Sequence, residues 1–296
     1  MAAVAESGER ELGRSWSAAV LSARRGEGAT LVATAAAALI DAETGPKGQN
    51  VILMDADLAT AGLSRLLRAW QATGTGDEYG AGPAAGDGRG LVGYALDRRV
   101  DLRDRSVQER LQDLRSPDGR TGDMALLALD GPGLSALDGL PGLPQIMACA
   151  AKRLAELAGC LLVDCGPGWN ARTRAVCESV DFVFVVGRAG DRTHPDTLRL
   201  AERLGETGLL PKTIGHIANR PEYVENRHGP QSAGGPRTEG DTLPLRTVID
   251  LPYDPRAAQA LAQGSLAGPG SAFETALRRG MEALEPDLFR TGFDIY

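Results

Sequence analysis

The chain has 296 residues, of which 43% are hydrophobic and 24% charged, and its formal net charge is −7. A chain of this length and composition can bury one large α/β core, so we expect a single domain and keep two domains as the alternative. The negative charge excludes an overall field that would attract nucleic acid or anionic lipid, and only a local basic patch remains compatible with such partners.

Residues 1–15 are polar and lack the apolar core of a secretory signal, so we expect a flexible leader there. No stretch approaches the ~18 apolar residues that a membrane span needs. The four cysteines form neither a CxxC pair nor a Cys/His zinc pattern, and Cys160 and Cys165 fall in an apolar run that predicts buried free thiols. These features favour a cytoplasmic protein without evident membrane or nucleic-acid binding.

A strand over Ser17–Leu21, a glycine-rich turn and an alanine-rich helix over Thr30–Ala42 form the first unit. In this order of elements, backbone N–H groups and a helix N-terminus can surround a phosphate. A working phosphate-binding loop also has a Lys directly before the Thr, because its charge neutralises the β- and γ-phosphates. Ala29 occupies that position here. The unit therefore predicts the fold and leaves the activity open.

The second expected strand, Val51–Met54, is a continuous apolar run that ends in Asp55-Ala56-Asp57. Open α/β sheets bind ligands beyond the carboxyl ends of their strands, so Asp55 and Asp57 could hold a Mg²⁺ shell or orient a water molecule. The alternative is structural: one carboxylate caps the following turn and the other is solvated.

Glycine-rich stretches near 72–90 and 226–242 predict mobile loops. Leu91–Leu114 alternates apolar and charged residues, which predicts one or two short helices. The apolar run Cys160–Val163 predicts a strand that leads to Asp164, and an Asp in this place commonly holds Mg²⁺ near a phosphate-binding loop. The other expected elements are strands over 124–133 (ending in a glycine turn), 182–186, 213–218 and 248–250, and helices over 143–157, 195–204 (with a start at 191–193), 256–263 and 273–284.

The alternation of strands and helices predicts an α/β fold, a doubly wound and mostly parallel sheet with helices on both faces. We expect residues 16–296 to form this single P-loop NTPase-like domain. In the final helix, Phe273, Ala276, Leu277 and Leu284 are expected to face the core rather than a lipid surface. The charged run Arg98–Arg115 is expected to be a solvated face, with a partner-binding surface as the alternative.

With these motifs in place, the chain resembles the ParA/MinD group of deviant-Walker P-loop ATPases. That group has KGGxGK[ST] after its first strand, apolar runs that end in DxD and in DxPPG, an Asn-[RK] pair after a late strand, and [IL]PYDP near the end. The matching segments here come in the same order: RRGEGAT (24–30), ILMDADL (52–58), LLVDCGPG (161–168), HIANR (216–220) and LPYDP (251–255). One such motif is weak evidence, whereas five in order predict the fold.

The resemblance implies ATP or ADP with Mg²⁺ as the cofactor, and it leaves open whether this chain has retained it. By the same resemblance, Asp55 and Asp57 are the catalytic carboxylates if the protein is active. The implied Mg²⁺ ligands are Thr30, Asp55 and Asp164. The implied nucleotide contacts are Arg24, Gly26, Glu27, Gly28, Ala29 and Thr30 in the loop, and Asn219, Arg220, Pro252, Tyr253 and Asp254 around the base.

Two departures from the family pattern bear on activity. The loop Lys is Ala29, and the signature Lys, which in the family reaches the partner's nucleotide across a dimer, is Arg24. Losing the loop Lys removes a charge-assisted contact worth ~1.5–3 kcal/mol and a transition-state donor commonly worth ~10²–10³ in rate. Arg24, Arg25 or Lys47 could compensate. The pattern therefore predicts weak or absent ATP hydrolysis.

Three functions follow from this reading. The first is a degenerate ParA/MinD-like scaffold or regulator that positions or assembles a cellular machine through protein partners, with a homodimer as one form. The second is an active ATPase of the same group, with a compensating cation and nucleotide-controlled dimerisation. The third rests on the GEG spelling, which resembles the tyrosine kinases of polysaccharide export, although this chain ends in a lone Tyr296 rather than a tyrosine cluster.

Overall fold

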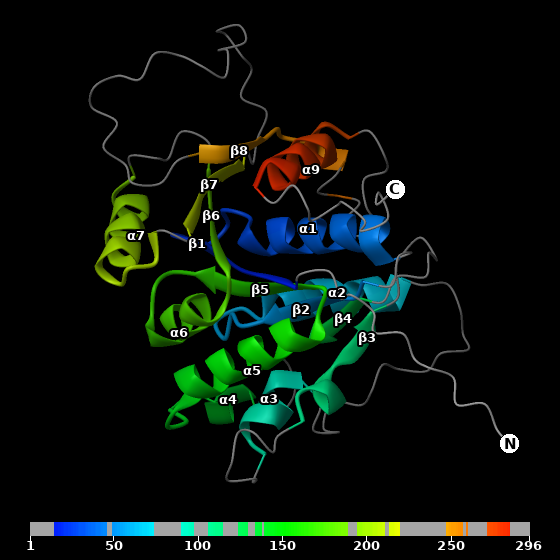
Figure 1. The fold of residues 1–296 in the computed structure, drawn as a ribbon, viewed down its shortest axis with the longest axis vertical. Helices are drawn as coiled ribbons and strands as arrows, with labels where there is room; N and C mark the ends of the chain where they lie inside the picture. The colour runs from blue at the N-terminus through cyan, green and yellow to red at the C-terminus, as the bar shows by residue number, and fades with distance from the viewer. Residues whose placement is uncertain are drawn as a thin grey trace, which may run out of the picture.

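The computed structural model describes residues 15–45, 49–73, 90–97, 106–114, 124–129, 134–137, 139–188, 194–210, 213–219, 247–256, 259 and 271–284. These residues form an eight-stranded sheet in the order β3-β4-β2-β5-β1-β6-β7-β8, drawn in Figure 1. Neighbouring strands are parallel, except for the antiparallel pair β3 and β4. The expected doubly wound, mostly parallel sheet is confirmed.

The strands are β1 (Trp16–Ser22), β2 (Val51–Asp55), β3 (Gln112–Leu114), β4 (Met124–Leu127), β5 (Cys160–Pro167), β6 (Phe182–Arg188), β7 (Thr213–Asn219) and β8 (Thr247–Leu251). The helices are α1 (Ala29–Thr44), α2 (Gly62–Thr73), α3 (Gly90–Ala95), the 3₁₀ turn η3 (Gln108–Arg110), α4 (Leu134–Leu137), α5 (Leu143–Leu157), α6 (Ala171–Ser179), α7 (Pro195–Glu206) and α9 (Ala272–Leu284).

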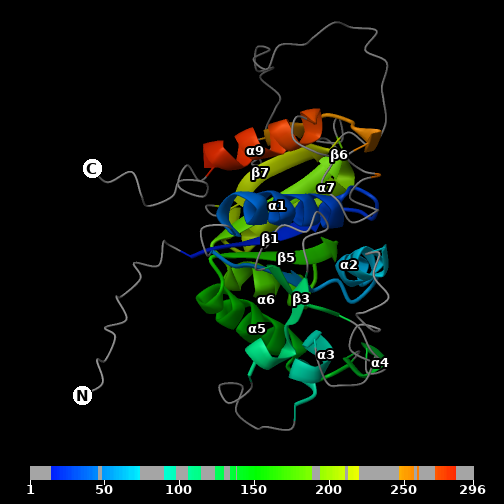
Figure 2. The same ribbon diagram turned by 90° about the vertical axis from the view of Figure 1, so that its right-hand side faces the viewer.

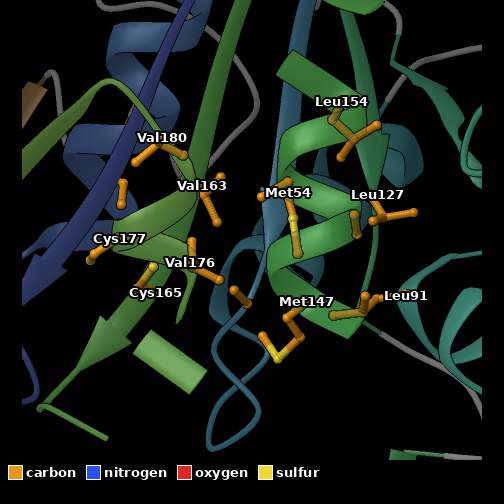
Figure 3. Close-up of a cluster of buried hydrophobic side chains, with 14 of the residues drawn as sticks. Met54, Leu91, Leu127, Met147, Leu154, Val163, Cys165, Val176, Cys177 and Val180 are labelled. Carbon is orange, nitrogen blue, oxygen red and sulfur yellow. The ribbon is translucent and has the colours of Figure 1, made fainter. Parts of the chain in front are cut away.

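The two faces of the sheet are both covered, which explains why its central strands are continuous apolar runs. Along β1, Ala18 and Val20 pack with the core of α1 and α9, whereas Ala19 and Leu21 pack with the core of α5, α6 and α7. Figure 2 shows β1 and β5 between α1 on one side and α5 and α6 on the other. In Figure 3, the strand residues Met54 and Val163 lie in the same buried cluster as Met147 of α5, on the second face.

Helix α1 packs on the sheet with α9 beside it on the same face, and nearly all of its alanines are buried. Phe273 and Leu277 of α9 are buried in the same cluster, which confirms that they face the core. Arg278 of α9 also forms an ion pair with Glu43 of α1 at 2.8 Å. Among the described residues, no helix is both long and apolar enough to cross a membrane.

Gly280 marks the closest approach between α9 and the sheet. A β-carbon built there would lie 2.3 Å from Cγ1 of Ile249 in β8. We expect Gly280→Ala to lower the free energy of unfolding by up to about 2 kcal/mol, because overpacking of roughly 1–3 kcal/mol is offset by a helix-propensity gain of about 1 kcal/mol. Urea denaturation measures this change.

Gly205 of α7 is the matched control for Gly280. Among the described residues, its added β-carbon would meet only the side chain of Leu210, whose flexible end, Cδ1, would lie 3.3 Å away. Gly205→Ala should therefore be neutral or stabilising. Equal effects of the two substitutions would contradict the proposed packing limit.

Several boundaries differ from the sequence-based expectations. Leu91–Leu114 ends in strand β3 rather than in a helix, because β3 pairs with the edge of β4 and places Leu114 in the core; tertiary pairing here overrides the local pattern. Helices α2, α4 and α6 were not expected. Helix α7 begins at Pro195 with His194 as its N-cap, whose Nδ1 accepts from Asp196 N at 3.2 Å, and residues 191–193 lie outside the described part.

Candidate functional site

Three segments singled out in the sequence converge at the carboxyl ends of β1, β2 and β5. Strand β5 lies between β1 and β2, and the parallel register pairs Asp55 of β2 with Asp164 of β5. The end of β1 is joined to the segment after β5 by a hydrogen bond of 2.8 Å from Gly168 N to Ser22 O. This edge of an open α/β sheet is the usual ligand-binding side.

The loop between β1 and α1 has the backbone form of an anion site. Gly26 and Gly28 have φ angles of +78° and +96°, which a residue with a β-carbon rarely adopts. Gly28 is the N-cap of α1, no side chain caps this helix, and its first turn carries no acidic residue. The first N–H groups of α1 therefore have no capping side chain, and the positive end of the helix dipole favours an anion there.

Thr30 and Asp164 form the polar centre of this edge. Thr30 Oγ1 donates to Asp164 Oδ2 at 2.6 Å, and Gly166 N donates to Asp164 Oδ1 at 3.0 Å. Hydroxyl and carboxylate oxygens are ligands that Mg²⁺ prefers, and Mg²⁺ usually takes one or two of them together with phosphate oxygens and waters. The described residues contain no cluster of three or more His, Cys, Asp or Glu that would hold a metal alone. The pair therefore fits a cation that arrives with a nucleotide.

Asp55 is fully buried beside this pair. Its Oδ2 accepts from Ser64 N at 2.8 Å and from Ser64 Oγ at 2.7 Å, and its Oδ1 accepts from Asp57 N at 3.1 Å. Burial, with the neighbouring Asp164 charge, raises the pKa of Asp55 to about 7. Burial also raises the pKa of Asp164 to about 6, against the lowering effect of the Thr30 hydrogen bond. Two buried carboxyl groups with raised pKa values, those of Asp55 and Asp164, thus lie on paired positions of neighbouring strands.

Asp57 is held in a different way. Its Oδ1 accepts from Ala59 N at 3.0 Å, its Oδ2 accepts from Thr60 Oγ1, and its carbonyl accepts from Ala61 N at 2.8 Å. This is the turn-capping arrangement that was the structural alternative in the sequence, although Asp55 is buried rather than solvated. The carboxyl also lies against Gly166, where an added β-carbon would be 2.3 Å from Asp57 Cγ.

The loop carries an ion pair of its own. Glu27 is almost completely buried, and its Oε1 accepts from Arg24 Nη2 at 2.9 Å and from Arg24 Nε at 3.1 Å. Its Oε2 accepts from Arg24 N at 2.9 Å. The guanidinium of Arg24 is therefore turned onto its own loop. Arg25 is exposed, and Lys47 lies outside the described residues.

A second arginine, which the sequence motifs did not indicate, also reaches the loop. Arg188 is the last residue of β6, and its Nη2 lies 3.8 Å from the position that a β-carbon on Gly26 would occupy. Strand β6 pairs with β1, with Val186 opposite Ser22, so its end lies beside the loop. The available signal was a basic residue just after the apolar run 182–186, but the neighbouring strand could not be known from the sequence.

The residues expected around a base lie at the same edge of the sheet, beyond β7 and β8. Asn219 ends β7, where its backbone is in register with Arg188 and Leu251. Pro252, Tyr253 and Asp254 follow β8, and Asp254 Oδ1 accepts from Arg256 N at 3.0 Å. The side chain of Asn219 and all of Arg220 lie outside the described part. The topology thus brings the late motifs to the edge that carries the loop.

The sequence matches no model of a known protein family, and no curated protein sequence matches it. Solved structures share the fold. A ParA family ATPase from Chlorobium tepidum has a TM-score of 0.65 at 14% identity, over 90% of this chain and 99% of that one. The septum site-determining protein MinD from Pyrococcus horikoshii, complexed with Mg-ADP, has a TM-score of 0.62 at 20% identity, over 91% and 96%. A chain of the MinC:MinD cell division protein complex of Aquifex aeolicus has a TM-score of 0.62 at 14% identity, over 95% of this chain and 99% of that one.

Proposed function

We propose that this chain is a ParA/MinD-like nucleotide-binding protein that hydrolyses ATP weakly or not at all. It acts as a scaffold or regulator in the positioning or assembly of a cellular machine, through protein partners and a homodimer. One observation carries the proposal: an uncapped helix N-terminus stands beside the Thr30–Asp164 pair, while buried Ala29 occupies the lysine position. The Mg-ADP complex of a MinD with this fold supports the choice of nucleotide.

In this proposal the backbone of residues 26–30 binds the phosphates through its N–H groups. Thr30 Oγ1 and Asp164 hold Mg²⁺, which would neutralise phosphate charge when bound. Asp55 holds the first turn of α2 beside the site, since it accepts two hydrogen bonds from Ser64. Ser64 Oγ in turn accepts from Leu129 N at 2.8 Å, which ties β4 to the same network.

Three features of the loop support slow hydrolysis. Ala29 brings no charge to the phosphates. The two carboxylate oxygens of Asp57 accept from Ala59 N and Thr60 Oγ1, so the turn after β2 fixes the orientation of this carboxylate. Arg24 is held by Glu27 within its own loop, so its guanidinium must break that ion pair before it can reach a partner's nucleotide. Hydrolysis therefore needs a rearrangement of Arg24 and lacks the lysine donor at position 29.

The test is the substitution Ala29→Lys, with ATP and ADP affinity measured by calorimetry in the presence of Mg²⁺. We expect about 10- to 100-fold tighter ATP binding, because a charge-assisted contact is restored. Turnover, measured as phosphate release, should rise by ~10² or more. A variant that gains neither affinity nor turnover would show that the site has lost more than the lysine.

Ala171→Lys is the matched control. Ala171 is also the first residue of a helix, α6, but there the Asn170 side chain accepts from Arg172 N and Thr173 N. A lysine at that capped N-terminus should leave nucleotide affinity unchanged. A similar gain in both variants would point to nonspecific attraction of the polyphosphate by added charge.

The second candidate is an active ATPase with a compensating cation, and the position of Arg188 favours it. Mg²⁺-dependent turnover by the unaltered chain, lost in Asp164→Ala, would select this candidate. Light scattering with and without ATP then tests whether the nucleotide controls dimerisation. The kinase-like alternative rests on Tyr296, which lies outside the described residues.

A further inference from the structure

We infer that Arg188, from strand β6, supplies the positive charge that the phosphate-binding loop lacks at position 29, and so binds the nucleotide phosphates beyond the first. The inference rests on the proposed nucleotide site and names a residue for it that lies outside every motif of the loop. In this inference the cation of the site comes from the neighbouring strand β6 rather than from helix α1.

The topology places Arg188 where this role requires it. Strands β1 and β6 are parallel neighbours, and Val186 lies opposite Ser22, the last residue of β1. Arg188 therefore stands two residues further along, at the level where the chain of β1 has already entered the loop. Its Nη2 lies 3.8 Å from the β-carbon position of Gly26. A side chain at residue 26 would compete with the guanidinium for this space.

Among the described residues, the charges of the region leave Arg188 and the exposed Arg25 as cations available to a ligand, and Arg188 is the one that reaches the loop from a neighbouring strand. Glu27, Asp55, Asp57 and Asp164 are buried carboxyls around the loop. The guanidinium of Arg24 is engaged with Glu27. Within the described part of the chain, no hydrogen bond or ion pair engages the side chain of Arg188, and the residue is exposed. The buried carboxyl groups place negative charge around the loop, so binding of a polyphosphate there needs a cation that is not already neutralised.

The chemistry of arginine suits this role. A guanidinium stays protonated at all physiological pH values and offers five N–H donors, and it is widely used for phosphate recognition. It is larger than the ammonium of lysine and can reach the loop from an adjacent strand. The loop N–H groups and Arg188 would then approach the phosphates from two different elements of the fold.

The experiment compares Arg188→Gln, Arg188→Lys and the unaltered chain by calorimetry with Mg-ATP, tripolyphosphate and AMP as separate probes. Arg203→Gln is the matched control, because Arg203 is an exposed arginine near the C-terminal end of α7, where it pairs with Glu206 at 3.0 Å. We expect Arg188→Gln to weaken ATP and tripolyphosphate binding about 10- to 100-fold. AMP affinity should change little, Arg188→Lys should fall between, and Arg203→Gln should match the unaltered chain.

The outcomes separate this inference from the proposed function. If the unaltered chain binds ATP and Arg188→Gln binds it equally well, the role of Arg188 is overturned and the nucleotide site stands. If the unaltered chain binds no ATP at millimolar concentration, Arg188 does not replace the lysine. In that case, ATP binding by Ala29→Lys retains the proposed site, and its absence overturns the site as well.

Discussion

Between pH 5 and pH 8, the free energy of unfolding should fall by roughly 3–4 kcal/mol, because two carboxyl groups must ionise inside the folded protein. Burial, with the Asp164 charge, raises the pKa of Asp55 to about 7, and burial raises that of Asp164 to about 6. Both values lie above the ~3.9 of an unfolded aspartate. The folded chain therefore binds more protons than the unfolded chain in this window, so stability is higher at low pH and is lost as the pH rises toward 7.

The substitution Asp164→Asn isolates this effect. An amide at position 164 can accept from Gly166 N and donate to Thr30 Oγ1, so both hydrogen bonds of the carboxylate have a replacement. We expect the variant to be more stable than the unaltered chain at pH 8, by about 2 kcal/mol, and to lose less stability between pH 5 and pH 8. Urea denaturation across this range measures both quantities. Parallel pH profiles for the two proteins would contradict the assignment.

The second large effect is expected at Gly166, which is held at a φ angle of +65° against the carboxyl of Asp57. Gly166→Ala should cost about 2–5 kcal/mol, from the left-handed backbone (about 1–2 kcal/mol) and from a β-carbon placed 2.3 Å from Asp57 Cγ (about 1–3 kcal/mol). The carboxyl must move away, and the hydrogen bond from Thr60 Oγ1 should be lost with it. Denaturation curves measure the cost in stability.

Gly168→Ala is the control for Gly166, since Gly168 has a φ angle of +88° and no atom of the described residues lies within 4 Å of an added β-carbon. It should show the backbone cost alone, about 1–2 kcal/mol. The difference between the two variants then measures the contact with Asp57. Equal losses would mean that the turn at Asp57 adapts freely to this loop.

The sheet could be predicted from the sequence because its central strands are uninterrupted runs of apolar residues. Strand β2, for example, was expected over Val51–Met54 and spans Val51–Asp55. Strand β3 could not be predicted, because only its pairing with β4 makes the charged segment around Gln112 extended. The start of helix α6 could have been predicted from the sequence, because Asn170, a strong N-cap residue, directly precedes the helix.

The site was predictable to the extent that its residues follow strand ends. Asp55 and Asp164 each stand at the end of an apolar run, and a parallel sheet brings such ends together. The loop ion pair of Arg24 and Glu27 depends on side-chain rotamers that spacing does not specify. Arg188 depends on β6 lying beside β1, which is a property of the strand order. Contacts within one strand–loop–helix unit were therefore accessible to sequence reasoning, and contacts between units were not.

The packing of α9 against α1 affects when α1 becomes buried during synthesis of the chain. The last residue of α1, Thr44, precedes Ala272, the first residue of α9, by 228 residues. At ribosomal rates of ~5–20 residues per second, that interval lasts roughly 10–45 s. During this time Phe273 and Leu277 are not yet present to pack with α1 in their shared core cluster. The helix behind the phosphate-binding loop is thus among the first segments to be made, but the core around it is completed only once α9 has been made.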